Sequence, residues 1–185
     1  ARAAESAGVA MVTVHGRTRE QGYGGEAEYD TVAAVKAALK VPVVANGDID
    51  SPEKAAAVLA RTGADAVMIG RAAMGRPWIF REISHYLAHG ELPPPPSVRD
   101  VQGWFTAHLH DHHALYGEFT GVRSARKHIG WAVRSLPGGE AFRGAMNAID
   151  DCRAQVQAVS DFFDRLADRH VTLPASNDAL SRLAA

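Results

Sequence analysis

Apolar positions in the first ninety residues fall into three short runs separated by amphipathic segments. The runs are VAMVTV at 9–14, VPVVA at 41–45 and AVMI at 66–69. Short runs rich in β-branched residues are typical of parallel strands that are buried on both faces. The pattern predicts strand, loop and helix repeated three times, which indicates a β/α fold.

Helical spacing fills the segments between the apolar runs. Residues 30–40 repeat apolar side chains at steps of three and four. Residues 51–61 begin with Ser51 as a helix N-cap and end before Gly63, a residue type that often terminates helices. A further helix is expected at 81–89.

Three parallel strands cannot close a barrel by themselves, because each edge strand leaves backbone groups unpaired. The unusual loops all follow the C-terminal ends of strands, which form the functional face of (β/α)8 barrels. The predicted fold class is therefore α/β, as the last three β/α units of a TIM barrel followed by a small all-α helical bundle. A doubly wound sheet is the alternative. Since the opening residues look like the end of a helix, we expect the chain to begin within a larger domain.

The pattern of apolar residues changes at LPPPPS, residues 92–97, which is a stiff and extended segment. Beyond it the strand pattern stops and helical spacing continues, over residues 98–117, 121–136 and 140–169. The predicted organisation has four parts: a partial barrel domain at 1–91, a linker at 92–97, a helical domain at 98–170 and a tail at 171–185.

Composition excludes several classes of protein. The 185 residues are 46% hydrophobic and 22% charged, with a net charge of −1, as in a globular protein. The one cysteine, Cys152, rules out an internal disulfide and a CxxC site, and its spacing from Val156, Val159 and Phe163 predicts a packing role. The apolar runs are far shorter than the ~20 residues that cross a bilayer. We expect a cytoplasmic protein without a membrane span.

Two loops behind consecutive strands carry the residues of a predicted phosphate site. Asn46, Gly47 and Asp48 follow the second strand, and Gly70 and Arg71 follow the third. Glycines let backbone N–H groups approach an anion, and an arginine adds a charged contact. Each motif alone is also an ordinary turn signal. Their placement behind consecutive strands favours the phosphate site.

The loop after the first strand reads HGRTREQGYGG, residues 15–25. His15 is placed to hydrogen-bond a polar edge of a ligand, and Arg17 to hold an anionic or carbonyl group. The alternative for His15 is a histidine at a strand end that bonds to the backbone.

Basic residues recur at helical spacing in the second half of the chain. Between 123 and 143 there are five basic residues and one acidic residue, a local balance of +4. Such a stripe suits contacts with RNA phosphates, and an indole can stack on an exposed base. The predicted nucleic-acid contacts are Arg123, Arg126, Lys127, Trp131 and Arg134. A solvated helix face with Trp131 in the core is the alternative.

Four histidines, His108, His110, His112 and His113, lie close together in the sequence. His108 and His112 share a helical face, but the segment lacks a cysteine and the ligand set is poor for a closed zinc site. We therefore predict no metal, and expect these histidines to be solvated.

Four motifs together resemble the flavin-dependent tRNA-dihydrouridine synthases, most closely the bacterial B-type branch. They are TVHGRT at 13–18, VPVVANGDI at 41–49, GADAVMIGRAAMGRPWIF at 63–80 and RKHIGW at 126–131. The resemblance covers residues 1–168. It implies an FMN-binding barrel with a C-terminal helical domain that binds tRNA.

Carried over to this chain, the resemblance implies that His15 contacts the flavin ring region. Asn46, Gly47 and Asp48 would hold the FMN phosphate together with Gly70 and Arg71. In the family NADPH reduces FMN, the flavin passes a hydride to uridine in tRNA, and a loop cysteine supplies the proton. That cysteine and a lysine that contacts the flavin precede the matching region. The resemblance thus places no catalytic residue in this chain, which is expected to be inactive alone and a monomer when complete.

Two other functions remain open at the level of sequence. One is another FMN-binding barrel oxidoreductase, such as a dihydroorotate dehydrogenase, which would not need the basic helical domain. The other is an RNA-binding module without catalytic activity.

Overall fold

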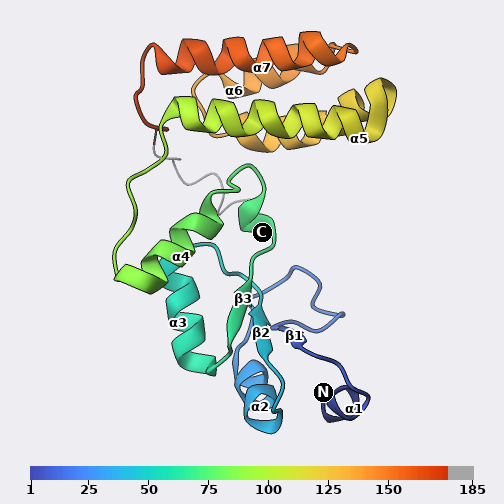
Figure 1. Ribbon diagram of the computed structural model, residues 1–185, viewed down its shortest axis with the longest axis vertical. Helices are drawn as coiled ribbons and strands as arrows, with labels where there is room; N and C mark the ends of the chain where they lie inside the picture. Colours follow the sequence, from blue (N-terminus) through green and yellow to red (C-terminus); the bar gives the residue numbers. More distant parts are fainter. Residues whose placement is uncertain (175–185) are drawn as a thin grey trace. The chain divides into compact units, whose positions relative to one another are not determined.

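The computed structural model describes residues 1–174, which divide into two compact units (Figure 1). The first unit covers residues 1–93 and the second begins at Pro94. Among the described residues, no helix is both long and apolar enough to cross a membrane. The predicted tail lies outside the described residues from 175 onward.

The first unit is a three-stranded parallel sheet with helices between its strands. The strand order is β1-β2-β3, which follows the chain. The three predicted strands are therefore confirmed, with slightly shorter bounds. The elements in order are α1 (Arg2–Ser6), β1 (Val12–His15), α2 (Asp30–Ala38), β2 (Val43–Asn46), α3 (Pro52–Thr62), β3 (Ala66–Met68), the 3-10 turn η1 (Arg71–Ala73) and α4 (Ile79–His89).

One face of this sheet forms the core of the unit. Side chains alternate between the faces of a strand, so Val12 and Val14 share a face with Val43, Ala45 and Val67 across the sheet. All of these belong to one apolar cluster, which also contains residues of α2, α3 and α4. Burial of this cluster holds the helices to the sheet.

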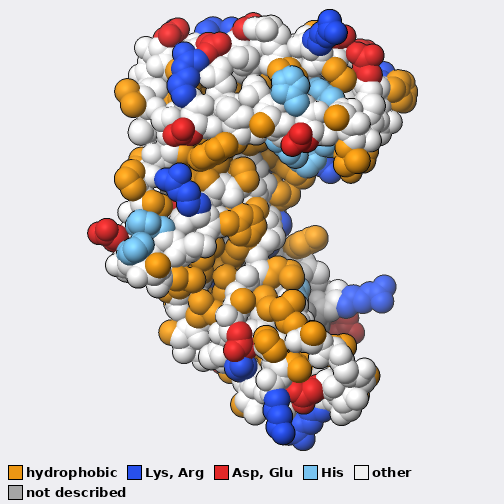
Figure 2. Space-filling model, viewed as in Figure 1, with side chains coloured by type: hydrophobic (Ala, Val, Ile, Leu, Met, Phe, Trp, Pro, Cys, Tyr) orange, Lys and Arg blue, Asp and Glu red, His pale blue; other side chains and the backbone are white. Residues whose placement is uncertain are grey.

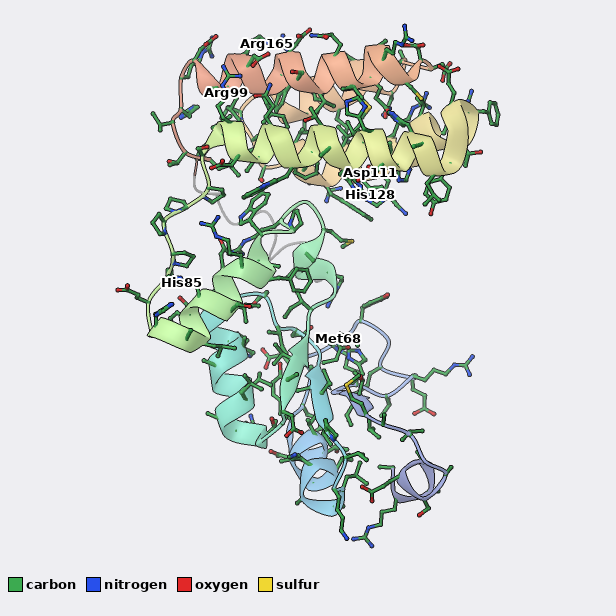
Figure 3. The ribbon with its side chains drawn as sticks, in the orientation of Figure 1. Met68, His85, Arg99, Asp111, His128 and Arg165 are labelled. Atoms are coloured by element: carbon green, nitrogen blue, oxygen red, sulfur yellow. The ribbon has the colours of Figure 1, made fainter. Side chains whose placement is uncertain are left out.

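The opposite face of the sheet is largely open within this unit. In the parallel register His15 lies beside Asn46, and Asn46 lies beside Met68. His15 is exposed, and Met68 at the end of β3 (labelled in Figure 3) has an exposed fraction of 45%. The three strands therefore present a row of side chains from their C-terminal ends on the same open face.

Local signals in the sequence fix both ends of α3. The Ser51 side chain accepts a hydrogen bond from the backbone N–H of Lys54 at 3.1 Å, and Pro52 begins the helix. Gly63 ends it in the left-handed conformation, with φ of 66°. The predicted N-cap and helix end are both confirmed.

The second unit consists of helices and their connecting loops over its described residues, apart from one isolated bridge between Ser97 and Thr172. Its helices are α5 (Val98–Val133), α6 (Gly139–Met146) and α7 (Cys152–Ala167). Figure 1 shows that α5 is two limbs that fold back on each other, with α7 along the first limb. Gly117 makes the reversal, with φ of 71° and ψ of 173°. The predicted helices at 98–117 and 121–136 correspond to these limbs.

The predicted helix at 140–169 is wrong as a single element. The structure divides it into α6 and α7, because the Asp151 carboxylate accepts a hydrogen bond from Ala154 N–H at 2.7 Å and caps a new helix. The buried side chains of α7 are Gln155, Val159, Phe162, Phe163 and Leu166.

Cys152 is thus the first residue of α7, where it is only half-buried. The expected stripe through Cys152 and Val156 is displaced, since both are less buried than Val159 and Phe163. Burial, reinforced by the charges of Glu118 and Asp151, raises the pKa of the Cys152 thiol. The side chain is therefore a neutral thiol at the edge of the helical core.

Candidate functional site

Asp48 organises the loops that follow the three strands. Its carboxylate accepts two hydrogen bonds from the Arg17 guanidinium, at 2.8 and 2.6 Å, and one from Arg71 at 3.1 Å. The backbone N–H of Ala27 donates to the same carboxylate at 2.8 Å. One side chain thus joins the loop of Arg17, 31 positions before it, to Arg71, 23 positions after it.

The Arg17 side chain is buried within this network. Its exposed fraction is 3%, and it also donates to the backbone carbonyls of Gly24 and Gly25, at 3.1 and 2.6 Å. These bonds close the loop on itself between Arg17 and Gly25. In this structure the guanidinium acts on the loop itself, while its predicted contact with substrate stays a prediction.

The backbone at Gly47 and Asp48 needs special conformations. Gly47 has φ of 126°, and a Cβ there would lie 2.7 Å from the Ala27 Cβ and 3.3 Å from Nδ1 of His15. Asp48 has φ of 47°, which is unusual for a residue other than glycine. The buried Tyr29 hydroxyl donates to the Gly47 carbonyl at 2.6 Å and holds the turn. The NGD sequence is therefore a closely packed turn.

His15 and Asn46 lie side by side at the strand ends. The His15 ring nitrogen Nδ1 is 3.3 Å from the Asn46 carbonyl, so the backbone contact considered as an alternative is present. The Asn46 amide donates to the Met68 carbonyl at 2.8 Å. The His15 side chain remains exposed, which leaves its other ring nitrogen, Nε2, able to meet a ligand.

Gly70 and Arg71 lie just after β3, an edge strand of the sheet, where η1 begins. A Cβ at Gly70 would meet no atom within 4 Å, so the backbone there is open to close approach. The Arg71 side chain is 36% exposed and lies over the ring of Tyr23 at 5.0 Å. Two guanidinium groups and one carboxylate give this cluster a net charge of +1. Arg71 is therefore the cation of the cluster that can reach an external anion.

The charge state of Asp48 follows from these contacts. Burial raises the pKa of its carboxyl, but hydrogen bonds from Arg17 and Ala27 and the charges of Arg17 and Arg71 outweigh this and lower the pKa overall. The carboxylate stays ionised at neutral pH. It therefore works as a fixed acceptor that holds the two arginines, and an anion would be repelled by it.

The second unit contains a basic pocket with a volume of about 250 Å³. Four of the five predicted nucleic-acid contacts line it, and the structure adds Gly130, Arg143 and Asn147, which the helical spacing did not connect to them. The lining residues are Arg126, Lys127, Gly130, Trp131, Arg134, Arg143 and Asn147. The Lys127 ammonium lies over the Trp131 ring at 5.2 Å. The pocket combines positive charge with a half-exposed aromatic face.

Arg126 is anchored to the loop between α6 and α7. It donates to the Ile149 carbonyl at 3.0 Å and to Asp150 at 2.7 Å. Its Nε is buried, and it is the one buried side-chain nitrogen or oxygen without a hydrogen-bond partner within residues 1–174. Arg123, outside the pocket, lies over the Phe119 ring at 3.9 Å and near Asp150 at 3.5 Å. Arg143 pairs with Glu140 at 3.0 Å, so Lys127 and Arg134 are the pocket cations that form no ion pair within residues 1–174.

The histidines depart from the expectation that they are solvated. His112 and His113 are 9% and 8% exposed, because their positions on the first limb of α5 face the second limb and α7. His113 is 2.8 Å from the buried Gln155 side chain, which donates to the Val122 carbonyl. Figure 2 shows histidine side chains grouped on this unit. The expectation is wrong for these two residues.

His128 from the second limb of α5 joins His108 and His112. One ring nitrogen of each lies within 4.8 Å of the others, and we call these three residues the histidine cluster. Figure 3 labels His128 on the second limb, and on the first limb Asp111, which precedes His112 in the sequence. Burial, together with neighbouring positive charge, lowers the pKa of His112 and of His128. Both imidazoles are therefore neutral at pH 7.

Comparison with known proteins decides the family. The family model for dihydrouridine synthase (Dus) matches residues 1–167. The chain is 56% identical to tRNA-dihydrouridine synthase B of Xanthomonas axonopodis pv. citri over 166 residues, which are 90% of this chain and 50% of that protein. It is 55% identical to the Pseudomonas aeruginosa protein of the same name, over 88% of this chain and 49% of that protein. It is 50% identical to the Yersinia pestis protein of that name, over 90% of this chain and 52% of that protein.

The chain belongs to the dihydrouridine synthase family. The resemblance inferred from four motifs is confirmed, including its B-type branch. The chain spans about half the length of the curated relatives it matches.

Three features of this dihydrouridine synthase chain could not be found by sequence spacing. Tyr29 closes the NGD turn from 18 positions away, and Asn147 reaches the basic pocket from beyond α6. His128 meets His108 only because α5 reverses at Gly117. His128 belongs to the RKHIGW motif, but that motif predicts contact with RNA and does not predict contact with the other histidines.

Proposed function

We propose that the chain is the C-terminal portion of an FMN-dependent tRNA-dihydrouridine synthase, which uses NADPH to reduce uridine in tRNA to 5,6-dihydrouridine. The family match over residues 1–167 carries this proposal. The arrangement of His15, Asn46 and Arg71 behind three consecutive parallel strands supports it. Ligand sites in β/α folds occur at the C-terminal ends of strands.

In the proposed enzyme, residues 1–91 supply the last three β/α units of a TIM barrel. The open sheet face supports this assignment, because it exposes Met11 and Met68 at 54% and 45%. Further strands of a closed barrel would cover such a face and pair with the edges of β1 and β3. Residues 98–170 then form the helical tRNA-binding domain, joined through the proline-rich segment at 92–97.

The loops after the strands fit a flavin phosphate in part. Arg71 would bind the phosphate, and Gly70 would let it approach the backbone closely, since the space beside Gly70 is open. Asp48 would position Arg71 instead of touching the phosphate, because its carboxylate is ionised. Gly47 would serve the turn, and Asn46 with His15 would face the flavin ring from the open face of the sheet.

The flavin, when bound, supplies the hydride that reduces the uracil ring. This chain's own residues bind and orient: Arg71 holds the anion, and Arg17 keeps the loop closed over the strand ends. The proposed mechanism takes its proton from a loop cysteine, whereas the one cysteine of this chain, Cys152, begins α7 and has a raised pKa. We therefore propose that the chain alone does not form dihydrouridine.

The basic pocket is the proposed tRNA contact. Lys127 and Arg134 would neutralise backbone phosphates, and the half-exposed face of Trp131 would support stacking of an unpaired base. Arg126 would position Asp150 and the loop before α7 as well as face the RNA. The proposed setting is the cytoplasm, with the complete enzyme as a monomer.

Flavin binding tests the cofactor part of this proposal. The full-length protein is titrated with FMN, and quenching of flavin fluorescence gives the dissociation constant. Replacing Arg71 with alanine removes a charge-assisted contact worth roughly 1.5–3 kcal/mol, so FMN should bind about ten to a hundred times more weakly. Arg19→Ala, in the exposed part of the first loop, is the matched control and should bind FMN normally. Equal affinities for the Arg71 variant and the wild type would remove Arg71 from the site.

A further inference from the structure

The histidine cluster joins the two limbs of α5. His108 and His112 lie one turn apart on the first limb, with ring centroids 5.8 Å apart. His128 on the second limb is 5.3 Å from the His108 ring and 5.4 Å from the His112 ring. Three imidazoles from antiparallel segments therefore converge on a common point.

We propose that His108, His112 and His128 form a binding site for one divalent transition-metal ion, with Zn²⁺ as the reference ion. Imidazole nitrogen is a preferred ligand of zinc, copper and nickel, whereas magnesium and calcium prefer oxygen. Three histidines with a fourth position open to solvent are a known ligand set for zinc. The exposed side of His108 is where that fourth position would meet water.

The distances allow the site to close without movement of the helices. A tetrahedral zinc ion with nitrogen ligands at roughly 2.0–2.1 Å holds them about 3.3 Å apart. One ring nitrogen of each histidine lies within 4.8 Å of those of the other two, so each pair of these atoms needs to close by at most about 1.5 Å. Small rotations of the side chains, above all of the exposed His108, supply this change.

Hydrogen bonding also selects the ligand atom of His112. The Ser124 hydroxyl donates to the Thr120 carbonyl at 2.7 Å, so it accepts from Nε2–H of His112 at 2.7 Å. The lone pair of His112 then lies on Nδ1, the nitrogen that remains for a metal. Histidine ligands usually donate their other N–H to such a partner, which fixes the tautomer and the ring orientation. Ser124 is thus a positioning residue for the site.

The prediction of no metal considers only the first limb of α5. That limb offers two histidines on one face and no cysteine, which is too few ligands. The reversal at Gly117 brings the third ligand from 16 positions beyond His112. The structure therefore changes the ligand count from two to three.

Calorimetric titration of the untagged full-length protein with Zn²⁺ tests this proposal. We expect one ion per chain at the cluster and at least about tenfold weaker binding for His108→Ala, because even loss of a ligand's hydrogen-bond partner costs about 10–100-fold. Since His108 is exposed, this variant should fold. Ser124→Ala keeps all three ligands and should weaken binding by about tenfold through the freed His112 ring.

Two control variants locate the ion. His110→Ala removes an exposed histidine of the same limb, and His85→Ala/His89→Ala removes a rival pair whose rings are 4.4 Å apart. Both should bind Zn²⁺ at the cluster as the wild type does. Absence of binding to the wild-type protein, wild-type affinity in His108→Ala, or loss of the ion in either control would overturn the proposal.

Spectroscopy with Co²⁺ gives a second readout that does not depend on affinity. Cobalt bound by three histidines and water in a tetrahedral site should give a strong visible absorption band that Zn²⁺ abolishes. The band should be absent from His108→Ala and present in His110→Ala. Co²⁺ bound to the wild-type protein without such a band would contradict the proposed ligand geometry.

Discussion

Among single residues, Asp48 is the one whose side chain holds together the loops that follow the strands. Its carboxylate pairs with the buried Arg17 side chain. Asp48→Asn should lower the free energy of unfolding by about 3–5 kcal/mol, because it leaves a buried guanidinium without its counter-charge. Urea denaturation measures the change. Asp30→Asn removes an exposed pair with Arg61 and should cost no more than about 1 kcal/mol. Similar losses in the two variants would contradict the structural role of Asp48.

The lowered pKa of Asp48 also predicts how stability depends on pH. The folded state holds its carboxyl pKa below that of the unfolded chain, about 3.9. The stabilisation is therefore complete above that value and is lost as the pH falls through the lower pKa of the folded state. In urea titrations below pH 4, the wild type should lose stability more steeply than Asp48→Asn. Parallel curves would show that Asp48 is not the group that titrates.

Gln155 is a buried polar residue in the helical unit. It is 0% exposed, is 2.8 Å from the His113 ring nitrogen and donates to the Val122 carbonyl at 3.0 Å. Gln155→Leu should destabilise by about 1–3 kcal/mol, because two buried groups lose their partner. Gln157→Leu, on the exposed side of α7, is the matched control and should stay within about 0.5 kcal/mol. Thermal or urea unfolding of both variants tests this, and a neutral Gln155→Leu would refute it.

At the scale of elements, α5 contains two glycines with opposite expected effects. Gly117 adopts φ of 71° and ψ of 173°, a region that is essentially restricted to glycine, so Gly117→Ala should cost about 1–3 kcal/mol. Gly103 lies within the first limb, and an added Cβ would meet no atom within 4 Å. Gly103→Ala should therefore stabilise by about 0.5–1 kcal/mol. Unfolding free energies that change in the same direction would contradict the reversal of α5 at Gly117.

Elements with strong local signals could be predicted from the sequence. The β-branched runs gave β1, β2 and β3, and Ser51 and Gly63 gave the ends of α3, because these preferences act within a few residues. The break between α6 and α7 was missed because apolar spacing continues across it. The signal there is Asp151, whose cap competes with a continuous helix. Local capping outweighed the longer periodicity.

Side-chain contacts between distant segments could not be predicted in the same way. The strand order placed the loops at one end of the sheet, but it did not show that Asp48 bonds Arg17 and Arg71. The histidine cluster forms because the chain reverses at Gly117, and the spacing of residues along one helix does not predict such a reversal. These hydrogen bonds and this burial depend on which distant segments of the chain lie close together in the folded protein. The predicted roles of His15, Gly70 and the basic residues stay predictions for experiments, as does the proposed place of Asn46 at the flavin ring.

At the scale of the whole molecule, the proposed function requires that tRNA binds the basic pocket. Lys127→Ala with Arg134→Ala should weaken tRNA binding and reduce the slope of log affinity against log salt by about 0.7 to 0.9 for each lost phosphate contact. Filter binding of the full-length protein over a series of salt concentrations measures both quantities. Arg153→Ala with Arg165→Ala, on the exposed side of α7, removes the same charge elsewhere and should change the slope little. Equal slopes for both double variants would place the RNA outside the pocket.

The most direct test of the proposed function is dihydrouridine in tRNA after incubation with the full-length protein, FMN and NADPH. Mass spectrometry of the digested nucleosides measures the product. We predict that dihydrouridine accumulates with the full-length protein, falls with Lys127→Ala/Arg134→Ala, and does not form with the 185-residue chain alone. The assay uses NADPH and tRNA that lacks the modification. The proposed function would be contradicted if the folded full-length protein bound tRNA and FMN under these conditions but formed no dihydrouridine.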